Sequence, residues 1–270
     1  GILIVDPQGE FYDNRFAAES GYNFDFHGLL RRARGNFGLV DLSEVALIGR
    51  RTFARLLMRM DFFKVLGFGT SEKQRQAADA LLDYMQSSQL RPDQADLEQI
   101  VGHLAEAAGY IYAGTQTSRR QEEVRNRFQQ YQNRVRTIWD SVYGLFAQEN
   151  RTPLNEVIDR VLLRREIIVL DVDRLTRQLA QTARIGSYEL KYILLNEIFT
   201  RMLQQVQVRF REGEGSNCLV VLDEAHRYVP QRARDNEDLE ALQRRLVDAA
   251  QTTRKYGIGW MFITTSIADF

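Results

Sequence analysis

Two adjacent carboxylates, Asp223 and Glu224, follow directly on an apolar run in the stretch CLVVLDEAHRYVP, residues 218–230. If this run is a strand of a parallel sheet, both carboxylates lie at the carboxyl edge, where open α/β sheets bind their ligands. One carboxylate can then hold Mg²⁺ while the other orients a water that attacks a phosphate. The alternative is a strand that ends in a solvated acidic turn.

A second acidic pair follows the N-terminal apolar run in VDPQGEF, residues 5–11, where Asp6 and Glu10 flank a Pro-Gln-Gly turn. Proline fixes φ and glycine tolerates positive φ, so a tight turn is expected after the strand. Such a turn presents two more carboxylates at the same edge of a sheet. Taken alone, the segment also fits an ordinary exit from a strand.

Basic and hydroxyl side chains bracket the last apolar run, in TTRKYGIGWMFITTS, residues 252–266. Arg254 can contact a γ-phosphate in its own or a neighbouring subunit, and Thr264, Thr265 and Ser266 can sense that phosphate from the end of the strand. The alternative is that Arg254 and Lys255 complement the dipole at a helix C-terminus, next to a polar strand end.

A phosphate-binding loop of the form Gly-x-x-x-x-Gly-Lys-Ser/Thr is absent from the 270 residues. The four lysines follow Phe63, Glu72, Leu190 and Arg254, and none follows a glycine. The backbone N–H groups and the lysine of that loop supply much of the phosphate binding. We therefore expect the isolated 270 residues to bind ATP poorly.

Four continuous apolar runs predict buried strands, at 2–6, 166–172, 218–223 and 258–265, and a weaker run at 37–42 is a fifth candidate. Continuous rather than alternating apolarity is typical of parallel sheets that are covered on both faces. Helical spacing of apolar residues at 187–211, and the acidic start and basic end of 235–255, predict crossover helices between the later strands. The fold class is therefore α/β, with a mostly parallel sheet flanked by helices.

Residues 43–163 contain helical patterns and no strand signal. Ser71 with Gln74 fits a capping box at the start of one of these helices. We therefore predict a core formed by 1–42 and 164–270, into which a helical bundle of residues 43–163 is inserted.

Charge and cysteine content exclude several classes of protein. The 36 basic residues, of which only four are lysine, balance 36 acidic ones, so no global field attracts nucleic acid or an anionic membrane. Cys218 is the single cysteine, which excludes an internal disulfide and suits the cytoplasm. The three histidines are scattered without metal-ligand spacing, and no apolar run has the length of a bilayer span.

The three motifs, taken in order, resemble the HerA/FtsK branch of P-loop ATPases, and within it the HerA-like hexameric DNA translocases. DEAHRYVP and RKYGIGW match that family's pattern with high specificity, IVDPQGEF corresponds to the family's first motif, and the insertion matches weakly. The resemblance implies a RecA-like core that uses ATP and Mg²⁺. It implies that Asp223 holds Mg²⁺ and that Glu224 is catalytic.

The resemblance also assigns the remaining residues and the partners. Asp6 and Glu10 would line the nucleotide site, and Arg254 would stabilise charge on the γ-phosphate. Thr265 stands where the family has a longer glutamine, so its sensing role is in question, and Gln8 replaces a histidine. The implied assembly is a ring, a hexamer in the family, that moves double-stranded DNA with a nuclease or an anti-phage effector and needs no membrane.

Alternative interpretations remain at this stage. The chain starts at the strand that follows the family's phosphate loop, so either the loop lies upstream of Gly1 or nucleotide binding has been lost. The rivals are a non-catalytic scaffold that forms rings and docks a partner, and a conjugative-transfer or FtsK-type motor. The segment 118–136 carries six arginines against two glutamates, which fits either a DNA-contacting loop or a solvated helix face. A DEAH-box helicase would need further motifs that the sequence lacks.

Overall fold

The computed structural model describes residues 1–14, 25–34, 36–114, 116–147, 149–183, 187–228 and 236–264. Thr265 and Ser266 therefore lie outside the described residues. The chain divides into two compact units, each treated separately below. Unit 1 comprises Gly1–Val45, Asn150–Gln178 and Gly186–Phe270, and unit 2 comprises Ala46–Glu149 and Leu179–Ile185.

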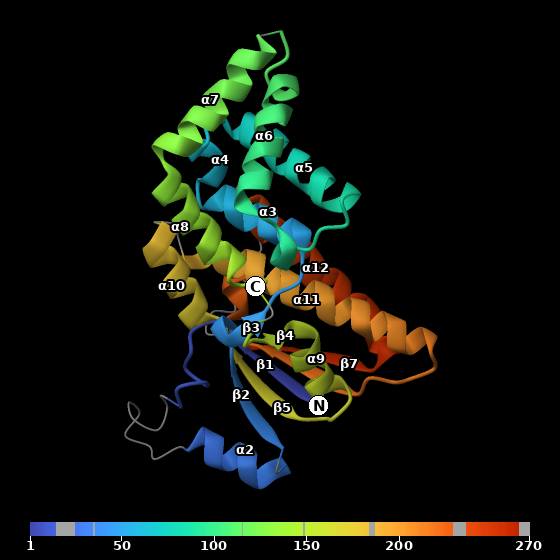
Figure 1. The fold of residues 1–270 in the computed structure, drawn as a ribbon. Helices are drawn as coiled ribbons and strands as arrows, with labels where there is room; N and C mark the ends of the chain where they lie inside the picture. Colours follow the sequence, from blue (N-terminus) through green and yellow to red (C-terminus); the bar gives the residue numbers. More distant parts are fainter. Residues whose placement is uncertain are drawn as a thin grey trace. The chain divides into compact units, whose positions relative to one another are not determined.

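Unit 1 is built on a five-stranded sheet in the order β2-β5-β1-β6-β7, in which neighbouring strands are parallel (Figure 1). The α/β class and the five predicted strands are confirmed. The strands are β1 (Ile2–Asp6), β2 (Phe37–Asp41), β5 (Ile167–Asp171), β6 (Cys218–Leu222) and β7 (Ile258–Phe262).

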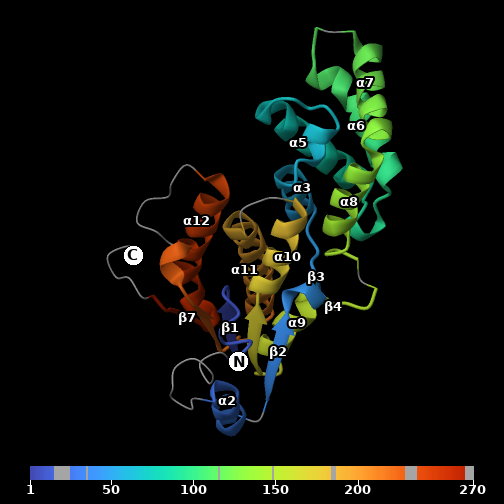
Figure 2. The same ribbon diagram turned by 90° about the vertical axis from the view of Figure 1, so that its left-hand side faces the viewer.

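Both faces of the sheet are covered, which explains the continuous apolar runs. On one face, Ile4, Val169 and Val221 form a cluster with Phe26 and Leu30 of α2. On the other side of the sheet from α2 lie α11 and α12 (Figure 1 and Figure 2), and Phe199 of α11 contacts Trp260 of β7 with ring centres 5.5 Å apart. The helices of this unit are α2 (Phe26–Arg34), α9 (Leu154–Leu162), α10 (Asp173–Ala183, ending in unit 2), α11 (Ser187–Arg211) and α12 (Glu237–Thr252).

The strand order reverses between β1 and β6. From β1 the chain crosses to β2, at one edge of the sheet, whereas from β6 it moves the other way, to β7 at the opposite edge. The connections that leave the carboxyl ends of these two neighbours therefore diverge. In open α/β sheets, this divergence opens a crevice at the carboxyl edge where ligands bind.

Unit 2 is helical. Two details of residues 43–163 differ from the sequence prediction. A short pairing of β3 (Val45–Ala46) with β4 (Thr152–Pro153), of which all residues but Ala46 belong to unit 1, occurs near the ends of the segment predicted to lack strands. The cap of α5 is Thr70, whose Oγ1 accepts from the Lys73 N–H at 3.2 Å, and not Ser71. The helices are α3 (Arg50–Arg59), α4 (Phe62–Val65), α5 (Ser71–Ser87), α6 (Leu97–Ile111), α7 (Thr117–Gln130) and α8 (Gln132–Tyr143).

Short 3₁₀ turns complete the chain, at Leu42–Glu44, Pro92–Gln94, Ala225–Arg227 and Thr253–Tyr256. The observed division differs from the predicted limits of 43 and 163, because α9 belongs to unit 1 with the sheet. Across the ranges that the structure describes, no helix combines the length and the apolarity that crossing a bilayer requires.

Candidate active site

Four neighbouring strands end in aspartate at the same level of the sheet. Asp6 pairs with Asp171, and Asp171 pairs with Asp41 on its other side. Asp223 stands one step beyond the pair of Val5 with Leu222, and its N–H donates to the Val5 carbonyl at 3.4 Å. The aspartate row formed by these four residues is buried, with exposures of 0 to 8 %.

Asp6 is held by the turn that follows it. Its Oδ1 accepts from the N–H groups of Gln8 at 3.3 Å and Glu10 at 3.2 Å, and its Oδ2 accepts from Tyr12 N–H at 2.8 Å. Gly9 adopts φ 73°, a value that glycine allows without strain. Burial raises the pKa of Asp6 above its ordinary range, and these backbone hydrogen bonds oppose the rise.

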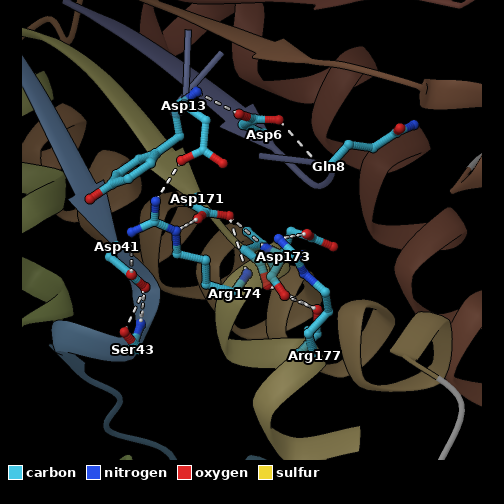
Figure 3. A network of polar contacts seen from close by, with 12 residues as sticks. Asp6, Gln8, Asp13, Asp41, Ser43, Asp171, Asp173, Arg174 and Arg177 are labelled. Carbon is cyan, nitrogen blue, oxygen red and sulfur yellow. Dashed lines mark hydrogen bonds and ion pairs between the residues drawn. The ribbon is translucent and has the colours of Figure 1, made fainter. Parts of the chain in front are cut away.

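The Arg174 side chain forms ion pairs with the β2 and β5 end of the aspartate row. The Arg174 guanidinium lies 3.6 Å from Asp41 and 3.3 Å from Asp171, and it also bonds Asp13 at 2.5 Å (Figure 3). Its guanidinium carbon stands 4.6 Å from the centre of the Tyr12 ring. Arg174 therefore ties the loop after β1 to the ends of β2 and β5.

Asp171 stays incompletely satisfied despite this cation. Its Oδ1 accepts from the Asp173 N–H at 2.7 Å, but its buried Oδ2 accepts no hydrogen bond, because its ion pair with Arg174 is poorly aligned. Burial, opposed by two backbone hydrogen bonds and reinforced by Asp41 and Asp6, raises the pKa of Asp171 to about 6.

The β1 and β6 end of the row differs from the end beside Arg174. Among the described side chains, neither Asp6 nor Asp223 has an ion-pair partner. Burial raises the pKa of Asp223 to about 6, and the neighbouring carboxylates of Glu224, Asp6 and Glu10 add to the rise. Four residues singled out from the sequence therefore lie near one another at the point where the strand order reverses: Asp6, Glu10, Asp223 and Glu224.

Glu224 has a backbone conformation that is costly for a residue with a side chain. Its φ of 50° and ψ of 39° lie in the left-handed region, and such outliers concentrate at functional sites. Its Oε2 lies 3.1 Å from Arg227 Nε and 3.5 Å from His226 Nε2. The carboxylate is therefore oriented by side chains of its own turn.

Arg254 lies at the amino edge of the sheet, whereas these carboxylates lie at the carboxyl edge. It lies in the turn Thr253–Tyr256 that precedes β7. The carbonyl of Gly257, which follows this turn, accepts from the N–H of Cys218 at the start of β6, at 2.9 Å. Five strand residues at about 3.3 Å each separate the two edges by roughly 16 Å. Arg254 therefore does not reach the aspartate row of its own chain.

Lys191 of α11 was not singled out from the sequence, and the structure buries it behind the site. Its Nζ donates to the Pro7 carbonyl at 2.5 Å and to Asp173 Oδ1 at 2.7 Å. Because its charge is paired with Asp173, Lys191 holds the turn after β1. Asp41, Asp171 and Arg174 were missed too, although a terminal Asp on every candidate strand but the last is visible in the sequence.

The donor set at Asp6 and Asp223 fits a magnesium ion that arrives with phosphate. In the part of the chain with described positions, no three His, Cys, Asp or Glu side chains converge to hold a metal by themselves. Mg²⁺ is usually held by one or two carboxylates together with substrate phosphates and water. Two buried carboxylates that pair with no cation in the described ranges meet that requirement.

Two cavities lie elsewhere, one of about 410 Å³ lined by Tyr112, Arg120 and Arg127, and one of about 240 Å³ between α9 and α11. Neither includes the aspartate row. No protein-family model and no curated protein matches this chain. Any functional conclusion therefore depends on the geometry of the carboxyl edge and on the sequence motifs.

Proposed function

We propose that this chain forms the magnesium and water-activating part of a HerA-like ring ATPase that hydrolyses ATP to move double-stranded DNA. The observation that carries the proposal is the position of Asp6 and Asp223. These two buried carboxylates have no ion-pair partner among the side chains that the structure describes, and they stand side by side where the strand order reverses. Substrate phosphates with a divalent cation are the ligands that such a site favours.

Each carboxylate has a separate task in this proposal. Asp223 holds Mg²⁺, directly or through water, and the ion supplies charge neutralisation on the phosphates. Asp6 supports the same site from β1, and Glu10 lines it from the following turn. Glu224 orients the water that attacks the γ-phosphate.

Arg254 serves the site of a neighbouring subunit. Its place at the amino edge of β7 excludes contact with the aspartate row of its own chain, so a stabilising role requires a head-to-tail arrangement of copies. Such heterologous contacts form a ring when the rotation between successive copies closes. We propose a hexamer, in line with the family that the motifs resemble.

The proposed partners follow from the same resemblance. Double-stranded DNA would pass through the ring, and a nuclease or an anti-phage effector would use the movement. Of the six arginines in 118–136, Arg119 and Arg120 pair with Glu123, and Arg136 lies 3.6 Å from Glu98. Three arginines of this segment are thus engaged in ion pairs, which weakens its claim as a DNA-contacting surface.

A non-catalytic scaffold is the second candidate, and two observations favour it. The 270 residues contain no phosphate-binding loop, and the Glu224 carboxylate is engaged by Arg227. A scaffold would assemble and dock its partner without turning over nucleotide. It would not depend on Glu224.

The test compares ATP hydrolysis by the full-length protein with that of Glu224→Gln and Asp223→Asn, with and without double-stranded DNA. We expect DNA-stimulated turnover in the wild type, its loss in both variants, and unchanged ring assembly by light scattering. Glu240→Gln, on the exposed side of α12, is the matched control and should retain turnover. Turnover that survives Glu224→Gln, or a wild type without turnover, would reject the catalytic role in favour of the scaffold.

A further inference from the structure

A chain of polar contacts links the end of β7 to the Glu224 carboxylate. Thr264 Oγ1 lies 3.2 Å from His226 Nδ1, and the other ring nitrogen, Nε2, lies 3.5 Å from Glu224 Oε2. The imidazole is half-buried between them. Thr264 and Glu224 are thus connected through one side chain although they belong to different strand ends.

The partners of the ring select its tautomer. A carboxylate can only accept, so the nitrogen that faces Glu224 carries the proton, and Nδ1 accepts from the Thr264 hydroxyl. The contact to Glu224 is long, and a shift of a few tenths of an ångström would make or break it. The position of the ring therefore decides whether Glu224 has one donor or two.

The backbone ladder ties the same two segments together. The Ile263 N–H donates to the Leu222 carbonyl at 2.9 Å, and the Ala225 N–H donates to the Ile263 carbonyl at 2.8 Å. The end of β7 is therefore bonded on either side of Glu224, whose left-handed backbone leaves it few alternative arrangements. A displacement at Thr264 reaches Glu224 through both the backbone and His226.

Arg227 supplies the second contact. Its Nε is 3.1 Å from the Glu224 oxygen that His226 also faces, so the carboxylate is shared between the two side chains. A carboxylate oxygen can accept from two donors at once, so both side chains can hold Glu224 in the same orientation. His226 is thus placed, together with Arg227, to set the orientation of Glu224.

We propose that His226 is a positioning residue that couples the end of β7 to the water-orienting carboxylate of Glu224. This inference rests on the proposed ATPase function. His226 is the side chain through which the end of β7 influences the Glu224 carboxylate. His226 does not touch the reacting atoms. It sets the orientation of Glu224 in response to Thr264.

The test is a double-mutant cycle on the turnover number of the full-length protein, using Thr264→Val and His226→Gln. If the two act through one relay, each substitution lowers kcat about fivefold, the double variant falls by no more than about tenfold, and KM for ATP is unchanged. Thr264→Ser keeps the hydroxyl and should restore turnover.

His103 provides the matched control, because this histidine stacks on Tyr84 in unit 2, far from β7 in sequence. His103→Gln should leave turnover unchanged and should combine additively with Thr264→Val. Thermal unfolding of every variant separates a folding defect from a kinetic one.

The outcomes separate a failure of the proposed ATPase function from a failure of the His226 relay. A wild type that does not hydrolyse ATP overturns the proposed function and this inference with it. Turnover in the wild type combined with an additive cycle, near 25-fold for the double variant, overturns the relay alone. Unchanged turnover in His226→Gln does the same.

Discussion

Asp6 and Asp223 end neighbouring parallel strands one step beyond the pair of Val5 with Leu222, and neither has a cation partner among the described side chains. The other end of the same aspartate row is compensated by Arg174. One half of the row therefore shares a cation within the protein, and the other half has no ion-pair partner among the described side chains. The divided charge, rather than the acidic residues themselves, distinguishes this edge from a solvated strand end.

The buried charge of Asp223 should lower the stability of the protein at neutral pH. Its folded pKa, about 6, lies above the ordinary value, so the folded state binds more protons between about pH 4 and 6 and stability falls as pH rises through that range. Asp223→Asn should therefore stabilise the protein by about 2 kcal/mol at pH 7.5 and by little at pH 4. Urea unfolding at the two pH values measures this difference.

The exposed Asp79 of α5 is the control, because Asp79→Asn should change stability little at either pH. A destabilised Asp223→Asn at pH 7.5 would show that the carboxylate is compensated in the folded protein.

Arg174 should matter far more than its neighbour Arg177. Arg174→Met leaves Asp171, which has no exposed side-chain surface, without its cation and should cost about 2 kcal/mol at pH 8. The loss should be smaller at pH 5, because Asp171, with a pKa of about 6, is then largely protonated. Arg177→Met removes only the pair with Asp173, from a half-exposed side chain, and should cost less than about 1 kcal/mol. Equal losses in the two variants would contradict the role assigned to Arg174.

The left-handed backbone of Glu224 should reverse the usual order of alanine and glycine. Both Glu224→Ala and Glu224→Gly remove the carboxylate, but only glycine relieves the φ of 50°. We expect the glycine variant to be more stable than the alanine variant by about 1 kcal/mol. At Glu240 in α12 the order should be normal, with alanine more stable by about 1 kcal/mol. Chemical denaturation of the four variants decides the point.

Arg254 should act between subunits. Full-length Glu224→Gln and Arg254→Ala proteins should each be inactive, but mixing them before assembly should restore part of the activity. Random mixing leaves about a quarter of the interfaces with both groups intact. ATP hydrolysis of the mixed rings measures the recovery. No recovery, in rings shown by mass spectrometry to be mixed, would place the function of Arg254 elsewhere.

The sequence was sufficient to predict the sheet, because each strand is a continuous apolar run, buried on both faces in the inner strands and partly exposed in the edge strands β2 and β7. It also predicted α11 within its observed limits, Ser187–Arg211, from the spacing of its apolar residues. The short pairing of β3 with β4 could not be predicted in this way, because two-residue strands carry no periodicity.

The site was only partly predictable. Asp6, Asp223 and Glu224 could be predicted from their position after apolar runs, and the parallel register of the strands brings them together. The pairing of Arg174 with Asp13, Asp41 and Asp171 depends on which strands are neighbours, and a single sequence does not contain that order. The sequence left open whether Arg254 acts in its own or a neighbouring subunit, and its position before β7 places it away from the aspartate row of its own chain.

The most direct test of the central claim is Mn²⁺ binding, followed by electron paramagnetic resonance, to the full-length protein with a non-hydrolysable ATP analogue. Asp223→Asn changes the open half of the aspartate row, and Asp41→Asn changes the half that Arg174 compensates. We expect nucleotide-dependent Mn²⁺ binding in the wild type, at least a tenfold loss of affinity in Asp223→Asn and little change in Asp41→Asn. Full Mn²⁺ affinity in Asp223→Asn, or equal losses in both variants, would contradict the claim.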